Sequence, residues 1–139
     1  HQLQILETRR ELDRLIARSA ASRANASERD AMTAIAQSME TAVKSGDLVA
    51  FLQWDNEMNR QAALSARNTV ATSAVAALHS ASRRFWFYHH QGQANATLRL
   101  HVALARAMAS GKPERAAEAS DRLIDDLFDF ATRTLITRT

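Results

Sequence analysis

The scarcity of chain-breaking residues is the feature that most limits what this sequence can fold into. Only three glycines and one proline occur among 139 residues. Aromatic residues account for 6% of the chain against 46% for all hydrophobic residues, so much of the apolar content is alanine. Alanine has the highest intrinsic helix propensity, and glycine and proline have the lowest. No segment alternates apolar and polar residues as a half-buried strand would. The sequence therefore predicts an all-α fold.

Helix-boundary signals divide the chain into six segments. The predicted helices span about residues 3–23, 28–44, 48–66, 69–90, 96–110 and 113–134. The connections are short, so we expect neighbouring helices to pack against each other in an antiparallel bundle of about six helices. A chain of 139 residues has the size of one domain with room for a hydrophobic core.

Polar capping residues mark the starts of these helices. Ser27 and Asp30 have the spacing of a capping box before the second helix. Further N-caps are expected at Asp47, Asn68 and Asn95. Gly46 suits the left-handed conformation that ends the second helix, and Pro113 suits the first turn of the sixth.

The composition excludes several classes of site and partner. The chain has no cysteine, which excludes disulfides and thiolate metal sites and fits a cytoplasmic location. A net charge of +3, from 18 basic and 15 acidic residues, is far from the concentrated basic patch of a nucleic-acid reader. No apolar run approaches the roughly 20 residues needed to cross a bilayer, so we expect no membrane partner. No nucleophile-and-base set or glycine-rich phosphate loop occurs, and we expect no enzymatic activity.

Three polar residues fall on helix faces that are otherwise apolar. Asp55 and Asn59 share the face of Phe51 and Leu52 on the third helix, and His101 lies within the apolar arc of the fifth. A buried charge normally finds a partner, a proton or a metal. The favoured interpretation is a hydrogen bond between Asp55 and His101. The alternative is a divalent metal ion, because Asp, Asn and His are all metal ligands.

Two arginines also point toward the predicted interior. Arg9 lies beside apolar positions on the first helix. On the fourth helix, Arg84 lies at the edge of an apolar face, while Arg83 points away. That predicted inward face consists of Val70, Ala74, Ala77, Ala81, Phe85 and Tyr88, which leaves Trp86 and Phe87 outward as a packing or dimer surface. An inward arginine is a donor fork suited to a carboxylate or phosphate. The sequence therefore predicts a polar cavity inside the bundle, and Tyr88 and Asn59 are further candidate ligand-binding residues.

Three stretches of the sequence resemble motifs of one family. They are ETRRELD at residues 7–13, SGDLVAFLQWDNEMNRQAALSARN at 45–68 and LRLHVALARAMASGKPERAAEAS at 98–120. The ordered set is similar to the FCD domain, the C-terminal effector domain of bacterial GntR-type transcription regulators of the FadR-like subfamily. The resemblance covers nearly the whole chain.

This resemblance implies an all-α bundle that binds a small effector, often a carboxylic acid. In many members of the family one Asp and three His hold a metal. The corresponding positions here are Asp55, Asn59, His101 and Leu123, so two of the four depart from the pattern. Zinc normally has four protein ligands at a closed site. We therefore expect no tightly held metal, with a weakly held divalent ion such as zinc as the alternative, and an effector held directly by Arg84, Arg9 or His101.

The resemblance also implies a domain organisation. Regulators of this family carry a winged-helix DNA-binding domain before the effector domain, and we expect residues 1–139 to be a single effector-binding and dimerisation domain without it. DNA would then be bound only through a domain that is not in this chain, and the expected assembly is a homodimer. Two other hypotheses stay open, a metal-dependent bundle enzyme that uses Asp55 and His101, and a helical interaction domain that binds no ligand.

Overall fold

The computed structural model describes residues 1–90, 92 and 95–137, and it confirms the all-α prediction. The described residues form six helices and no strand. The helices are α1 (Gln2–Arg23), α2 (Ala26–Ser45), α3 (Leu48–Ala66), α4 (Thr69–His89), α5 (Asn95–Ala109) and α6 (Pro113–Thr137). None of them combines the length and apolar character that a transmembrane helix needs.

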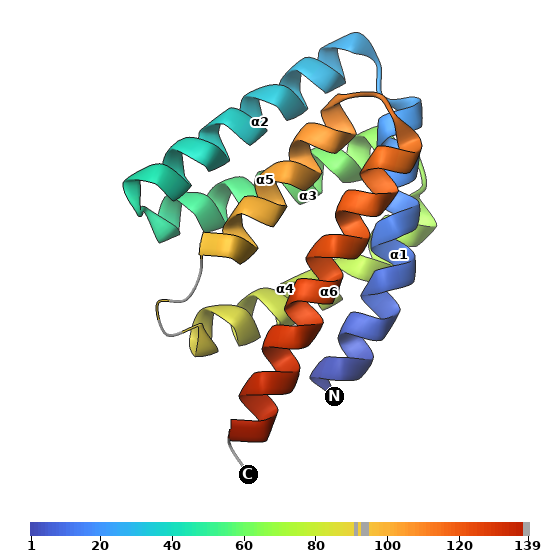
Figure 1. Ribbon diagram of the computed structural model, residues 1–139. Helices are drawn as coiled ribbons and strands as arrows, with labels where there is room; N and C mark the ends of the chain where they lie inside the picture. Colours follow the sequence, from blue (N-terminus) through green and yellow to red (C-terminus); the bar gives the residue numbers. More distant parts are fainter. Residues whose placement is uncertain (91, 93–94, 138–139) are drawn as a thin grey trace.

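The helices form a bundle whose pairing only partly follows the order of the chain. Figure 1 shows α1 and α6 side by side in opposite directions, with α2, α3 and α5 grouped together beyond them. Sequence neighbours pack together in the pairs α2–α3 and α5–α6. The expectation that every helix packs against the next one is wrong for the pairs α1–α2, α3–α4 and α4–α5, which make little contact. The extensive contact of α4 is with α1 instead. A space therefore separates α3 from α4, and side chains from both helices line it.

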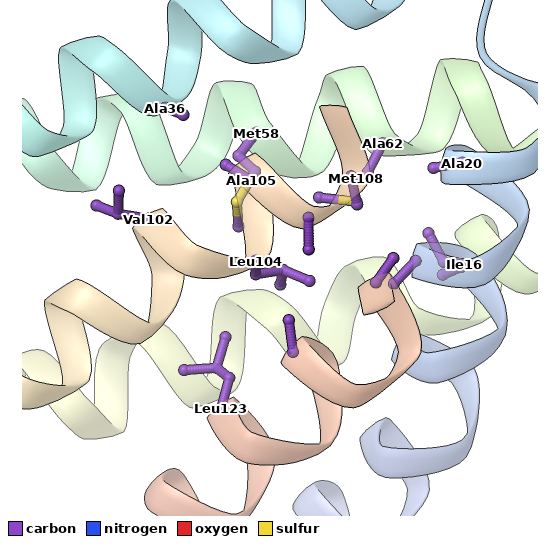
Figure 2. Close-up of a cluster of buried hydrophobic side chains, with 14 of the residues drawn as sticks. Ile16, Ala20, Ala36, Met58, Ala62, Val102, Leu104, Ala105, Met108 and Leu123 are labelled. Atoms are coloured by element: carbon purple, nitrogen blue, oxygen red, sulfur yellow. The ribbon is translucent and has the colours of Figure 1, made fainter. Parts of the chain in front are cut away.

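Small side chains let the helices of the core approach closely. Ala36, Ala105 and Ala116 are completely buried, and each comes from a different helix. Larger residues fill the remaining space, including Phe51 and Met58, which are 1% and 2% exposed. Figure 2 shows core side chains of α1, α2, α3, α5 and α6 converging on one region. Complete burial of a Met or Phe side chain stabilises the fold by about 1.5–3 kcal/mol, so each of these residues contributes substantially to the stability of the bundle.

The helix caps agree with the sequence at most positions. Asp47 accepts a hydrogen bond from the Ala50 N–H at 3.0 Å, and Asn68 accepts one from the Ala71 N–H at 3.1 Å. Gly46 adopts the predicted left-handed conformation at φ 70°. Asn95 is the first residue of α5 rather than the residue before it. Residues 91, 93 and 94 of the predicted break lie outside the described residues.

The capping box of α2 lies two residues earlier than predicted. Asn25 accepts a hydrogen bond from the Glu28 N–H at 2.8 Å, and the Glu28 carboxylate accepts one from the Asn25 N–H at 2.9 Å. The predicted pair, Ser27 and Asp30, is wrong. Asn and Ser cap equally well, but the longer side chain of Glu reaches back to the N-cap N–H more readily than that of Asp.

The predicted inward face of α4 is also wrong. Trp86 was expected outward and is 6% exposed, whereas Tyr88 was expected inward and is 76% exposed. The buried face of α4 consists of Ala71, Val75, Ser82 and Trp86. Alanines occupy both sides of this helix, so the apolar pattern hardly distinguishes two faces about 100° apart. The consequence is that Arg83 points into the bundle and Arg84 is exposed.

Candidate ligand site in the bundle interior

A polar cavity lies between α1, α3, α4, α5 and α6. Its volume is about 50 Å³. Its polar lining consists of Arg9, Asp13, Asp55, Asn59, His79, Ser82, Arg83, His101 and Ser120. The rest of the lining is apolar and includes Phe51, Trp86 and Leu123. A few polar groups that converge in an apolar setting are typical of a ligand site, and bundle interiors are common places for one.

Asp55 is bound by an arginine that the sequence analysis placed outside. Asp55 is 6% exposed, on the buried face of α3. The Arg83 Nε donates to its Oδ2 at 3.1 Å across from α4. The Nε2 of His101 lies 3.8 Å from Oδ1, which is longer than a hydrogen bond. The buried carboxylate therefore takes its main partner from Arg83, and the predicted hydrogen bond between Asp55 and His101 is not formed.

His101 is oriented by contacts on both sides of its ring. Its Nδ1 lies 2.9 Å from the Thr97 carbonyl oxygen, which can only accept, so Nδ1–H is the donor. The Thr97 hydroxyl in turn donates to the Asp126 carboxylate at 2.6 Å. The Phe51 ring meets the imidazole edge-on, with 5.4 Å between ring centroids. These contacts direct Nε2 toward Asp55, at 3.8 Å from its Oδ1.

A second charged group lines the cavity from α1 and α4. The Arg9 Nε donates to the Asp13 Oδ2 at 2.8 Å, and the His79 Nε2 lies 2.6 Å from the other oxygen. Burial alone would raise the pKa of Asp13, but the charges of Arg9 and His79 and their hydrogen bonds outweigh it, so the pKa lies below its ordinary value. Asp13 therefore stays ionised beside the cavity.

Both arginines keep donors free for a ligand. Arg9 and Arg83 each bind a carboxylate through Nε. Among the described residues, no hydrogen bond from a terminal Nη atom of either guanidinium is found. The two guanidinium charges balance the carboxylates of Asp13 and Asp55. The site can therefore accept an anion without losing its internal ion pairs.

A larger groove adjoins the cavity. It has a volume of about 320 Å³ and is lined by residues of α1, α3 and α4, with Leu104 and Met108 from α5. The two hollows share Asp13, Asn59, His79, Arg83 and Leu104. The groove follows from the packing of α4 on α1 rather than on α3. The shared polar residues form the boundary between the cavity and the groove.

The structure brings together four of the six predicted ligand-binding residues. Arg9, Asp55, Asn59 and His101 line the cavity. Arg84 and Tyr88 do not, because the fourth helix is rotated relative to the prediction. Sequence reasoning missed Asp13, His79, Ser82, Arg83 and Ser120 as lining residues. A signal for two of them was present, because Asp13 follows Arg9 by one helical turn and His79 follows Val75 by one turn.

The donor set does not fit a tightly bound metal. The only metal-binding donors at the family positions are Asp55, Asn59 and His101, because Leu123 is a buried hydrocarbon side chain in the cavity wall. Across the described residues, no group of three or more His, Cys, Asp or Glu is arranged to hold a metal ion. In addition, the Arg83 guanidinium already places a positive charge on Asp55. A divalent cation at this carboxylate would be repelled by it.

Comparison with known proteins identifies one family. A protein-family model described as the FCD domain matches residues 4–126. This range contains every polar residue that lines the cavity. No curated protein was found to match the chain.

Proposed function

The chain belongs to the FCD domain family, the ligand-binding and dimerisation domain of GntR regulators, and we propose that it binds a small organic acid inside its bundle. The carboxylate of the ligand would bind the terminal nitrogens of Arg83 and Arg9. In this proposal the domain works as a homodimer and controls DNA binding by a winged-helix domain of the same regulator. The FCD domain is a regulatory, non-catalytic domain, which makes the alternative of a metal-dependent enzyme wrong.

One observation carries the proposal, the pair of arginines with unused donors at a buried cavity. Arg9 is 8% exposed and the side chain of Arg83 is 21% exposed. Hydrogen bonds between a guanidinium and a carboxylate are charge-assisted and about twice as strong as neutral ones. A low-dielectric interior strengthens them further, which favours a carboxylate over a neutral ligand of the same size.

The proposed mechanism acts through the attachment of α4. Arg83 connects α4 to Asp55 on α3, and α4 otherwise packs mainly on α1. A carboxylate bound by the terminal nitrogens of both Arg83 and Arg9 connects α4 to α1, while Arg83 keeps its Nε contact with Asp55, and so favours one of two positions of α4. The ligand shifts the population of the two arrangements only by its difference in affinity for them. In a dimer, a shift of α1 changes the spacing of the DNA-binding domains joined to it.

The proposal requires no metal. The positive charge that a metal supplies in related domains would come here from Arg83, whose Nε lies 3.1 Å from Asp55. An organic anion could then bind to the guanidinium directly.

Thermal stabilisation by organic acids tests this function. A ligand that binds only the folded state raises Tm with its concentration, and we expect this for at least one member of a panel of mono- and dicarboxylates. Arg83→Lys keeps the positive charge on Asp55 but removes the fork, and it should abolish most of the shift. Arg84→Lys is the matched control, since Arg84 is the adjacent residue and is exposed. An equal loss of the shift in both variants, or no shift with any acid, would refute the proposal.

A further inference from the structure

Two buried hydroxyl groups in the cavity have no hydrogen-bond partner. Among the described residues, the Oγ atoms of Ser82 and Ser120 are the buried side-chain polar atoms without one. Ser82 on α4 is 8% exposed and Ser120 on α6 is 1% exposed. Both residues line the cavity that contains Arg9 and Arg83. Leaving a buried polar group unpaired costs free energy, so such a group needs an explanation.

Hydroxyl groups on other helices of the bundle are satisfied locally. Thr8, Thr33 and Thr41 each donate to the carbonyl oxygen four residues earlier, at 3.0, 2.9 and 3.1 Å. This local bond is available to any helical Ser or Thr. Ser82 and Ser120 do not make this local bond, and no other protein group in the cavity wall bonds to their hydroxyls. Both hydroxyls therefore keep an unused hydrogen-bonding capacity in the cavity wall.

We propose that Ser82 and Ser120 form a neutral subsite that selects an acid carrying a hydroxyl group near its carboxylate. This inference rests on the proposed function, because the charged part of the ligand is assigned to Arg9 and Arg83. A serine hydroxyl donates one hydrogen bond and accepts others, so each serine can pair with a ligand hydroxyl. The cavity volume of about 50 Å³ suits a small acid. The ligand class is a short hydroxy acid.

The presence or absence of one ligand hydroxyl group is expected to change the affinity strongly. A ligand of the same length without the hydroxyl fills the cavity but leaves both serines unpaired. Loss of hydrogen bonds to buried groups reduces affinity by about tenfold per bond. The wild-type protein should therefore bind a hydroxy acid about tenfold to a hundredfold more tightly than its deoxy analogue.

Matched ligand pairs test this inference in the whole chain. Dissociation constants would be measured by calorimetry for malate against succinate and for lactate against propionate. Ser82→Ala, Ser120→Ala and the double variant should weaken binding of malate or lactate and leave binding of succinate or propionate unchanged. Ser73→Ala is the control, because Ser73 is an exposed serine on the same helix as Ser82. The serine variants retain the small size of the side chain and should fold.

The outcomes separate this inference from the proposed function. Acid binding without preference for the hydroxyl, or a preference that survives the double variant, overturns the subsite and leaves the anion site standing. A neutral polyol such as erythritol tests the serine subsite without the anion site. If no acid binds but erythritol raises Tm in wild type and not in the double variant, the subsite stands and the anion site falls. If neither acids nor erythritol bind, both fail.

Discussion

Removal of Arg83 should destabilise the folded domain far more than removal of its neighbour. In Arg83→Met the side chain keeps an unbranched apolar stem but loses the guanidinium, so the carboxylate of Asp55 loses its main partner. Asp55 is 6% exposed, so water can replace the guanidinium only partly. Breaking a buried ion pair from one side costs about 3–5 kcal/mol, and the 21% exposure of the Arg83 side chain places this pair at the lower end. We expect a loss of about 3 kcal/mol in the free energy of unfolding.

Urea denaturation followed by circular dichroism at fixed protein concentration measures this loss. With a slope of about 2 kcal/mol per molar urea, the midpoint should fall by about 1.5 M. Arg84→Met, at an exposed position, should change the free energy of unfolding by less than about 0.5 kcal/mol. The double variant Asp55→Asn with Arg83→Met should be more stable than Arg83→Met alone, since no charge is left unpaired. Equal effects at positions 83 and 84 would refute the assignment of Arg83 as the partner of Asp55.

Three further predictions follow from other contacts. The folded-state pKa of Asp13 is lowered, so its ionised form stabilises the fold at pH values above the ordinary pKa of 3.8, and this stabilisation is lost as the pH falls through the folded-state pKa. Asp13→Asn should therefore have a smaller free energy of unfolding than wild type at pH 7. Acid denaturation curves should show that this difference disappears at low pH. Gly111→Ala should lower the free energy of unfolding by about 1 kcal/mol, because Gly111 has φ +74°, and an unchanged urea midpoint would contradict this. Treatment with a chelator should leave Tm unchanged, since the donor set around Asp55 does not fit a metal, and a drop of several degrees would show that a metal is held after all.

The helices could be predicted from sequence because their ends carry strong local signals. The third helix was expected at 48–66 and spans Leu48–Ala66, since Gly46 and Asp47 end one helix and cap the next. Such signals depend on a few adjacent residues, and the chain contains few competing ones. The misplaced capping box of α2 shows the limit, because Asn25 and Ser27 are equally suitable caps and only the length of Glu28 decides between them.

The interior of the site was harder to predict, because it depends on the rotation of α4. The residues Asp55, Asn59 and His101 were found because α3 and α5 carry Phe, Leu and Met that identify one face. On α4, alanines occur all round the helix, and the choice between Arg83 and Arg84 depends on where Val75 and Trp86 pack. That packing is a property of the tertiary structure. The pairing of His79 with Asp13, 66 residues apart, has the same origin.

Helix α4 is attached to the bundle mainly through one other helix, α1, and it also lines the candidate ligand site. All six helices contribute side chains to the common core, but α4 packs mainly on α1. Substitutions at the positions of α4 that line the cavity and the groove can thus widen or narrow the room for a bound molecule while the pairs α1–α6, α2–α3 and α2–α5 keep their packing. Related chains can thus come to accept larger or smaller molecules through cavity-lining positions of this one helix other than Arg83, whose ion pair with Asp55 supports the fold.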